Sequence, residues 1–511
     1  MSEGCIRLPL RSYPGMNPFV LDWLGGAFPD LPRFDPARVA GSESRRRGRT
    51  PAFLAALAES NRRWGAHVER ELEAWASGET VTLIAGQQVG FAGGPLYTLA
   101  KIASLLEIRR RLESEGKRAT LFFWLATEDH DYEEVATLHL PVAALTGSGR
   151  GRSQLDLLTL RAAPPPDTRA AVGLLPVPEP LIAELLALMD LPRPRWLREG
   201  ITFRDSFAEL LVSIFGSEIV LVDSLLPELR REAEPLFEAI LRRWDDVQKA
   251  VAADSAELRS RGYQPQISSR EEEYTVLFRL DGEGKRRIVA RGEAPGDPAT
   301  LSTSALTRPL LQDYLFAPDV FVGGPAEVAY YAQQRTMHAL FEVAMPAVAL
   351  RGHVLVAPKR TLRAFDRHAI APQEVFSTAE EVLARREPDG IAEIRSIAGR
   401  ARRDLAEALT RIGELALPAE HAMARALSRS IGHIEYHFDK LTERAIRALV
   451  RKDRERWAAM QELIATFHPD RQVQDRVAAW FPWWCQYGKH LVDRVVEEIE
   501  PGSESFKMIG L

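Results

Sequence analysis

The stretch that most constrains the fold of this chain runs from Thr80 to Leu112 and reads TVTLIAGQQVGFAGGPLYTLAKIASLLEIRRRL. Val81 and Ile84 bound a short apolar run, four glycines then interrupt any regular pattern, and from Leu99 onward apolar residues recur with helical spacing. This pattern predicts a strand, a glycine loop and a helix. Such a loop brings backbone N–H groups to the N-terminus of a helix, where phosphate or carboxylate binds. The loop has neither the GxGxxG pattern nor the lysine of a P-loop, so tight packing of strand against helix is an equal alternative.

Length and charge limit the classes of protein that fit. A chain of 511 residues is too long for one ordinary hydrophobic core, which predicts two or three structural units. The formal net charge of -5 argues against a protein that coats nucleic acid. The N-terminus lacks the apolar segment of a signal peptide, and no later stretch has the apolar length of a membrane helix. We therefore expect a cytoplasmic protein whose partners are small molecules or protein, with no nucleic acid and no membrane.

The two cysteines, Cys5 and Cys485, give no sign of a disulfide or of a zinc site. They stand far apart in the chain and neither belongs to a CxxC pattern. A disulfide framework and a structural metal site are therefore both disfavoured.

An acidic segment follows the next predicted strand. Residues 119–126 (ATLFFWLA) are almost continuously apolar, as in a strand of a parallel sheet that is covered on both faces, and Glu128, Asp129, His130 and Asp131 come directly after them. Ligands of open α/β sheets gather at the carboxyl ends of the strands, so we expect this segment beside the glycine loop. It could act as acid or base, hold a substrate ammonium group or, less favoured, bind a metal. The alternative is the first turn of a helix, where acidic residues are favoured.

A second glycine-proline loop repeats the first. Residues 323–325 (GGP) follow an apolar run, as residues 93–95 (GGP) do, and a helix with Glu327 and Tyr330 on its first turns comes behind them. Two such helix starts at two strand ends would face a shared crevice.

The remaining segments carry weaker patterns. They predict an irregular arm at residues 1–50, a helix at 51–76, a proline-rich insertion at 140–200 with a short helix at 181–189, a helix at 203–215, a strand at 219–223, a long helical segment at 227–261, a β-hairpin at 274–280 and 287–290, two strands at 347–350 and 353–356 that complete the sheet, and a last helical region at 471–500.

Two long apolar stripes indicate a different kind of structure toward the C-terminus. Over residues 391–415 and 427–448, apolar residues alternate spacings of three and four, with Pro418 between them, which predicts an antiparallel coiled-coil hairpin. The stripe then slips by one residue near Asp453, which indicates a local change in winding. The hairpin either packs only on itself or protrudes as a dimer arm. We favour the arm, because so long a helical pair offers more apolar surface than one partner covers.

Five ordered blocks carry a resemblance over nearly the whole chain: GQQVGFAGGPLYTLAK, FWLATEDHDYEEV, TRPLLQDYL, FVGGPAEVAYYAQ and DRQVQDRVAAWFPWWCQYG. They resemble the bacillithiol biosynthesis cysteine-adding enzymes, the BshC family. The resemblance implies an α/β fold with a Rossmann-like parallel-sheet core, connective insertions and a C-terminal antiparallel α-helical coiled coil. We expect the core at 1–385 with insertions at about 140–200 and 262–300, the hairpin at 386–468, and a helical segment at 469–511 that docks on the core.

The resemblance also implies an activity and a set of partners. The implied enzyme is a homodimeric ligase that adds L-cysteine to the amino group of glucosaminyl-malate, the last step of bacillithiol biosynthesis. A carboxylate does not acylate an amine unaided, so we expect an activated form of cysteine, with ATP as the possible cosubstrate. The sequence leaves the need for a divalent cation open.

These implications give a hypothesis for the site. His130 is the expected general base toward the glucosamine amine, with Asp129 and Asp131 beside it in the catalytic group. Arg308 or Arg351 is expected to hold the malate carboxylates. Lys101, expected on the first turn of its helix, would counter negative charge. The residues expected to bind substrate or nucleotide are Gly86, Gln87, Gln88, Gly93, Gly94, Pro95, Tyr97, Lys101, Glu128, Arg308, Gly323, Gly324, Pro325, Glu327, Tyr330 and Arg351.

Two other functions fit the same sequence. One is a non-catalytic nucleotide- or thiol-sensing module that recruits a partner through its coiled coil. The other is a related ligase that joins a different amino acid to a different amino sugar. The complete acidic segment and the two glycine-proline loops favour an enzyme.

Overall fold

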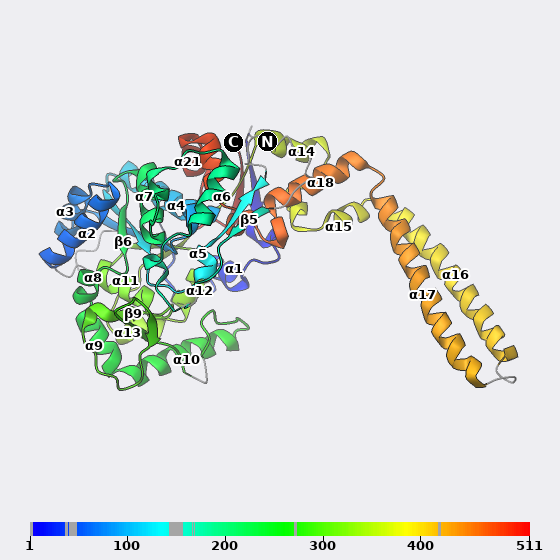
Figure 1. Cartoon of the computed structure of the whole chain (residues 1–511), viewed down its shortest axis with the longest axis horizontal. Coiled ribbons are helices and arrows are strands. Elements are labelled where there is room, and N and C mark those ends of the chain that lie inside the picture. Colours follow the sequence, from blue (N-terminus) through cyan, green and yellow to red (C-terminus); the bar gives the residue numbers. More distant parts are fainter. Residues whose placement is uncertain are drawn as a thin grey trace. The chain divides into compact units, whose positions relative to one another are not determined.

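The computed structural model describes residues 4–35, 39, 49–142, 157–165, 167, 169–269, 273–416 and 421–511, without the side chains of residues 416 and 421–428. The chain forms two compact units (Figure 1). The core unit comprises Met1–Leu362 and Pro469–Leu511, and the hairpin unit comprises Arg363–His468. The chain therefore leaves the core unit once and returns to complete it.

The main sheet of the core unit has five parallel strands in the order β11-β10-β2-β3-β6. Strands β2, β3 and β6 follow one another across the sheet, and β10 and β11 then extend it on the other side of β2. The strand order reverses between β2 and β10, which is the switch point where open α/β sheets bind ligands. This sheet confirms the predicted Rossmann-like core. Its strands are β2 (Val81–Gln87), β3 (Ala119–Leu125), β6 (Val220–Asp223), β10 (Val320–Gly323) and β11 (Ala347–Leu350).

A second sheet joins segments from both ends of the chain, in the order β1-β13-β12. Its strands are β1 (Cys5–Pro9), β13 (Ser505–Gly510) and β12 (His353–Ala357). The prediction that residues 353–356 complete the main sheet is wrong. Only two residues separate β11 from β12, whereas parallel neighbours in one sheet need a crossover of about a dozen residues or more. The arm at residues 1–50 is also more regular than predicted, since it contains β1 and a helix.

Strand β2 leads through the glycine loop into α4 (Leu96–Ser114), as the sequence predicts. Strands β2 and β3 are buried along almost their whole length because they lie inside the sheet. Helix α4 is buried around most of its circumference, because it contacts three strands of the main sheet and also β12 and α21 (Lys489–Glu498). This burial fixes the polar side chains that α4 carries, including Lys101.

Two long helices predicted from the sequence are interrupted. The predicted helix at 51–76 breaks at Gly65, which has a φ of +102° and ends α2. The segment at 227–261 forms three helices, and Pro235 stands in the first turn of the second of them. The helices of the core unit are α1 (Pro18–Leu24), α2 (Pro51–Trp64), α3 (Glu69–Ser77), α5 (Tyr132–Val135), α6 (Glu179–Met189), α7 (Phe203–Phe215), α8 (Pro227–Glu232), α9 (Glu234–Arg242), α10 (Trp244–Ser260), α11 (Arg308–Phe316), α12 (Pro325–Ala332), α13 (Arg335–Leu340), α19 (Gln474–Val477) and α20 (Phe481–Tyr487), and α14 (Lys359–Arg367) spans the boundary between the units.

Two small antiparallel sheets complete the core unit. One pairs β4 (Thr137–Pro141) with β5 (Leu157–Arg161). The other confirms the predicted hairpin as β7 (Leu277–Leu280) and β8 (Arg286–Ile288), to which β9 (Leu301–Thr303) adds a third strand.

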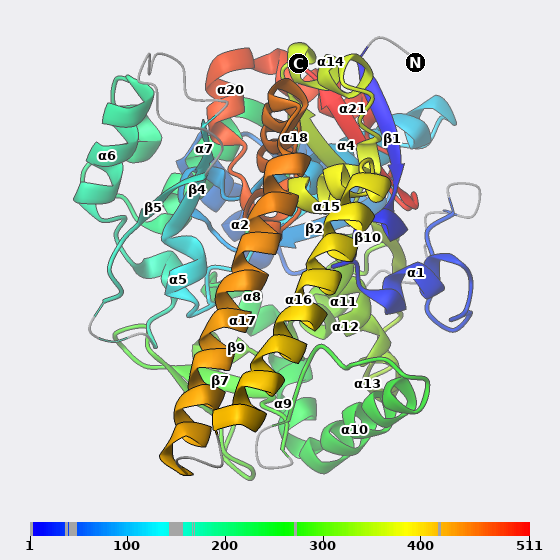
Figure 2. The same ribbon diagram turned by 90° about the vertical axis from the view of Figure 1, so that its right-hand side faces the viewer.

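The hairpin unit contains α15 (Ala379–Ala384), α16 (Pro388–Ala416), α17 (His421–Val450) and α18 (Arg454–Phe467). Helices α16 and α17 lie side by side (Figure 2) and confirm the predicted coiled-coil hairpin. The predicted change in winding near Asp453 is wrong: α17 ends, and Asp453 caps α18 by accepting a hydrogen bond from the Arg456 N–H at 3.0 Å. Across the ranges that the structure describes, no helix combines the length and apolar character needed to cross a membrane.

Candidate active site

A cleft with a volume of about 1330 Å³ lies at the carboxyl ends of β2, β3 and β10. Both glycine-proline loops contribute to its wall, which confirms the prediction of a shared crevice. The acidic segment after β3, the β4–β5 pair, the β7–β9 sheet, residues 472–479 and short segments at residues 13–17 and 266–268 also line it. Small-molecule sites usually measure about 300–1,000 Å³, so this cleft has room for more than one substrate. The predicted site residues that line it are Gly86, Gln87, Gln88, Gly94, Pro95, Tyr97, Lys101, Glu128, Asp129, His130, Asp131, Arg308, Gly324, Pro325, Glu327, Tyr330 and Arg351.

Two predicted ligand residues, Gly93 and Gly323, are not part of this lining. Gly93 has a φ of +84°, and a Cβ atom there would lie 2.7 Å from the indole of Trp480. The same indole donates a hydrogen bond to the Gly93 carbonyl at 3.0 Å. A Cβ atom on Gly323 would lie 2.6 Å from the ring of Phe321. These two glycines therefore permit close packing, which is the alternative that the sequence left open for the loop.

Lys101 and Glu327 form a buried ion pair at the switch point between β2 and β10. The Lys101 Nζ lies 2.5 Å from Glu327 Oε2 and donates to the Gly86 carbonyl at 2.6 Å and to Gln87 Oε1 at 2.9 Å. These contacts use all three N–H groups of the ammonium. Burial raises the pKa of Glu327, but the charges of Lys101 and Arg308 outweigh it and hold the pKa below its usual value. Lys101 lies on the second turn of α4, not the first, and its charge is balanced by the protein itself.

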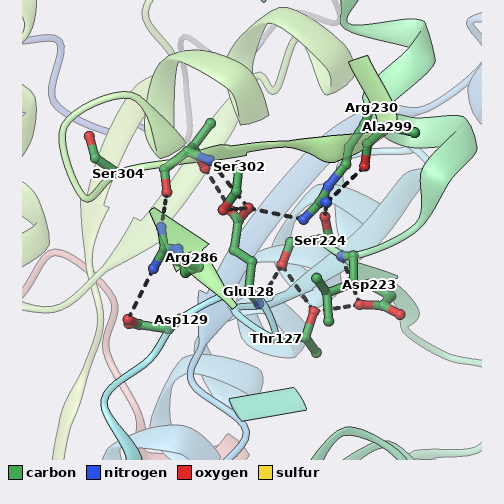
Figure 3. Close-up of polar contacts among 12 residues, drawn as sticks. Thr127, Glu128, Asp129, Asp223, Ser224, Arg230, Arg286, Ala299, Ser302 and Ser304 are labelled. Atoms are coloured by element: carbon green, nitrogen blue, oxygen red, sulfur yellow. Dashed lines mark hydrogen bonds and ion pairs between the residues drawn. The ribbon is translucent and has the colours of Figure 1, made fainter. Parts of the chain in front are cut away.

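Glu128 is the centre of a buried polar network (Figure 3). Its carboxylate accepts hydrogen bonds from Ser302 Oγ at 2.7 Å, and from the Thr303 hydroxyl and N–H at 2.6 and 3.2 Å. The Arg230 guanidinium lies 3.4 Å away and also donates to the Ala299 carbonyl at 3.0 Å. The network ties the end of β3 to β9 and α8. Since protein donors surround its carboxylate, Glu128 is better suited to hold this wall together than to bind the ammonium group predicted for it.

Arg286 of β8 brings Asp129 and His130 together. Its Nη1 lies 3.0 Å from His130 Nδ1 and 3.6 Å from Asp129 Oδ1, and Gln88 Nε2 donates to Asp129 Oδ2 at 2.7 Å. A guanidinium can only donate, so Nδ1 is the acceptor and the proton of the neutral imidazole is assigned to Nε2. The one lone pair of the ring is therefore directed at Arg286. Sequence reasoning missed this arginine, which lies 156 residues from His130 along the chain.

Asp131 directly precedes α5, and Glu134 lies in its first turn. The Asp131 carboxylate caps the helix by accepting a hydrogen bond from the Glu134 N–H at 3.1 Å, which is the structural alternative considered for the acidic segment. Glu134 Oε1 accepts a hydrogen bond from the Tyr97 hydroxyl at 3.3 Å. Glu134 is an exposed residue, but partial burial of its carboxylate and repulsion by Asp131 and Asp129 raise its pKa above the usual value. A carboxyl group with a raised pKa in a cleft is a candidate for acid–base chemistry.

Arg308, Arg351 and Arg476 add positive charge to the cleft beside the paired Lys101, Arg161 and Arg286. Arg351 is buried and donates at 2.7 Å to Asp475, which also accepts from His353 Nδ1 at 3.0 Å. Burial raises the pKa of Asp475, but the Arg351 charge and the His353 hydrogen bond hold it well below its usual range. The Arg308 guanidinium has an ion-pair partner only at 3.8 Å and makes no hydrogen bond with any described residue. Arg476 is exposed, and no ion pair joins it to the part of the chain described above. No sequence pattern indicated that Arg476 would reach this site.

The fold and the cleft define the class of this protein: a Rossmann-like core with a ligand-binding switch point, joined to a coiled-coil hairpin. The chain matches the N-terminal Rossmann-like domain of bacillithiol biosynthesis BshC over residues 27–295 and 291–352. Residues 354–511 match the C-terminal coiled-coil domain of BshC. The chain belongs to the BshC family.

Curated relatives have the same name and similar length. A protein of Solibacter usitatus is 28% identical over 485 residues, which cover 88% of each chain. A protein of Geobacillus kaustophilus is 25% identical over 97% of this chain and 98% of its own. A protein of Koribacter versatilis is 26% identical over 81% of each chain. Each is named "Putative cysteine ligase BshC".

Proposed function

We propose that this BshC-family enzyme is a ligase that joins the carboxyl group of L-cysteine to the amino group of glucosaminyl-malate, which forms bacillithiol in the last step of its biosynthesis. The observation that carries the proposal is the charge distribution of one cleft. Among the described residues, Arg308 and Arg476 line it without close anionic partners, and Glu134 lines it without a cationic one. Both proposed substrates carry an amine and at least one carboxylate, so each finds a group of opposite charge there.

The reaction needs an activated cysteine, and we propose ATP as the cosubstrate. An adenylate or an acyl phosphate would turn the cysteine carboxylate into an acyl group that an amine can attack. Arg308, Arg351 and Arg476 suit the carboxylates of malate and the phosphates of a nucleotide, since guanidinium groups bind both through paired hydrogen bonds. A reaction that consumes ATP is expected in the cytoplasm.

The proposal does not extend to a protein-bound metal. Within the residues that the structure describes, no three His, Cys, Asp or Glu side chains are grouped as ligands of one ion. A divalent cation that arrives with the nucleotide would be held by its phosphates as well as by the protein.

We also propose that the chain is a homodimer through its hairpin. Several large apolar side chains are exposed on α16 and α17, and some keep about half or more of their surface in water, which favours a partner over the hairpin alone. They are Ile397 (51% exposed), Ile412 (52%), Leu415 (69%), Ile434 (40%), Tyr436 (58%) and Leu441 (63%).

Mass spectrometry of the purified protein with cysteine, glucosaminyl-malate and ATP, each omitted in turn, tests the proposed reaction. We expect a product of bacillithiol mass only in the complete mixture. Product without ATP would contradict ATP activation and point to another activated donor. No product from folded protein under any condition would contradict the substrate pair and favour a related ligase or a sensing module.

A further inference from the structure

We propose that Glu134 is the general base that takes the proton from the amino group of the amino-sugar substrate, and that Tyr97 positions it. The inference rests on the proposed ligase reaction and assigns its proton-transfer step to a residue. Three observations carry it: the pairing of the charges in the cleft, the direction of the hydrogen bonds that reach Glu134, and the state of the His130 lone pair.

The pairing of charges singles out Glu134. Seven carboxylates line the cleft, and five of them have a cationic partner: Glu128 with Arg230, Asp129 with Arg286, Glu133 with Arg161, Glu327 with Lys101, and Asp475 with Arg351. Among the described residues, neither Asp131 nor Glu134 has one. Asp131 is used as the N-cap of α5. Glu134 is thus the cleft carboxylate that a substrate ammonium can neutralise without displacing a protein group.

A directed chain of hydrogen bonds connects Glu134 to the buried ion pair. The Lys101 ammonium can only donate, so the Gln87 oxygen that it contacts at 2.9 Å is the acceptor. This fixes the Gln87 amide with its NH₂ toward the Tyr97 hydroxyl, at 3.2 Å. The Tyr97 oxygen therefore accepts from Gln87, and its own proton points to Glu134 Oε1 at 3.3 Å. These hydrogen bonds hold one oxygen of Glu134 in place. The negative charge of the carboxylate remains to be neutralised by a ligand.

His130, the base expected from the sequence, is placed differently. Its Nδ1 lone pair accepts a hydrogen bond from Arg286 at 3.0 Å, so the imidazole can take up a proton only after that arginine moves. A carboxylate keeps lone pairs on both oxygens, so Glu134 needs no such movement. The raised pKa of Glu134 adds to this difference, because a carboxylate becomes a stronger base as its pKa approaches that of the amine.

In the proposed step, proton transfer to Glu134 precedes formation of the C–N bond. The substrate enters as an ammonium ion paired with Glu134 and transfers one proton to that carboxylate, which frees the nitrogen lone pair. The lone pair forms the C–N bond to the carbonyl carbon of activated cysteine. The bond from that carbon to the phosphate oxygen breaks, and AMP or inorganic phosphate leaves with the electron pair. The second nitrogen proton passes to solvent as the amide forms, and Glu134 later returns its proton to solvent.

The first test compares binding of two compounds by calorimetry at a pH where the amine is charged. Glu134→Gln keeps the shape of the side chain and its hydrogen bond from Tyr97 but removes the charge. We expect it to weaken binding of glucosaminyl-malate by about 10-fold or more, as for loss of a charged hydrogen bond. N-acetylglucosaminyl-malate, which has no ammonium, should bind equally to both proteins. Glu133→Gln is the matched control, since the neighbouring Glu133 is also exposed but is already paired with Arg161.

The second test is the pH dependence of single-turnover rates. Glu134→Gln should lower the rate by about 10²-fold or more and remove the acidic limb of the profile, as expected for loss of a general base. Tyr97→Phe removes a hydrogen bond that lowers the pKa of Glu134, so the acidic limb should move to higher pH while the maximal rate changes less. A purely structural role of Tyr97 would leave the position of the limb unchanged.

The outcomes separate this inference from the reaction on which it rests. If the wild type binds glucosaminyl-malate and forms product, but Glu134→Gln binds and reacts like Glu133→Gln, Glu134 is not the base and the reaction stands. If His130→Asn alone loses the rate and the acidic limb, His130 is the base and the inference is overturned. If the wild type binds neither compound, the proposed substrate is wrong, and the assignment of Glu134 falls with it.

Discussion

Charged side chains in the cleft differ in whether the protein already neutralises them. Lys101 and Glu327 satisfy each other in the floor of the site, whereas Arg308 has only a distant partner. Breaking an existing ion pair costs free energy. A charged group without a close partner therefore contributes the most favourable interaction energy when a ligand binds. We therefore expect the ligands to contact the cationic and anionic side chains that lack a close partner.

Arg308 gives the clearest prediction for the malate part of the substrate. Arg308→Met should raise KM for glucosaminyl-malate by about 10- to 100-fold with a smaller change in kcat, because a charged hydrogen bond to the carboxylates is lost in both ground and transition state. Steady-state kinetics with varied glucosaminyl-malate measures this. Glucosamine without malate serves as the control substrate, and its kinetics should not change. An equal effect on both compounds would contradict contact with malate.

Gly93 gives a prediction about stability. Gly93→Ala should lower the free energy of unfolding by about 2 kcal/mol or more, because a left-handed φ and contact with Trp480 both oppose a Cβ atom. Gly116→Ala is the matched control, with a φ of +78° and, apart from its chain neighbours, no atom of a described residue within 4 Å of its Cβ position. It should lose only about 1 kcal/mol. Equal losses in urea unfolding would show that the Trp480 contact is unimportant.

The site residues that directly follow a strand end were predictable from the sequence. Their contacts with residues that are distant in the sequence were not. His130 and Asp129 come directly after β3, and the rule that ligands gather at carboxyl ends places them in the cleft. Their partner Arg286 arrives from a hairpin 156 residues later. No local pattern distinguished Glu134 from its neighbour Glu133. Within the described ranges, the two differ because the Tyr97 hydroxyl reaches Glu134 and a cation pairs with Glu133 alone.

Among the elements, the β7–β9 sheet forms a wall of the cleft and depends on the network around Glu128. Arg230→Met should leave the Glu128 carboxylate buried without a cation and destabilise the protein by about 3 kcal/mol. Amide hydrogen exchange in β9 should accelerate, since both Ser302 and Thr303 bond to that carboxylate. Arg231→Met, at an exposed position next to it, is the control. Unchanged exchange in β9 would contradict this anchoring role.

Apolar patterns predicted the elements of the main sheet because buried parallel strands are continuous apolar runs. They failed for β12, which has the same kind of sequence but pairs with β13 from the C-terminus. Pairing between remote strands leaves no local pattern in either of them. The long predicted helices likewise missed their breaks, at Gly65 for example, because a helical apolar spacing continues on both sides of it.

At the scale of the whole molecule, the exposed apolar stripe of the hairpin predicts a dimer. Leu441→Glu combined with Ile412→Glu should convert the protein to a monomer, because each change would bury a charge in the interface. Sedimentation velocity over a range of concentrations measures the association, and circular dichroism checks that helix content is retained. A wild type that is monomeric at every concentration, or a variant that remains dimeric with full helix content, would contradict the assignment of the interface.

The most direct test of the central claim, an ATP-driven joining of cysteine to glucosaminyl-malate, is mass spectrometry with cysteine labelled by ¹⁸O in its carboxyl group. The account predicts that bacillithiol keeps one labelled oxygen in its new amide and that the other appears in AMP or in inorganic phosphate. Formation of bacillithiol with no label in either phosphate product, or no bacillithiol at all, would contradict it.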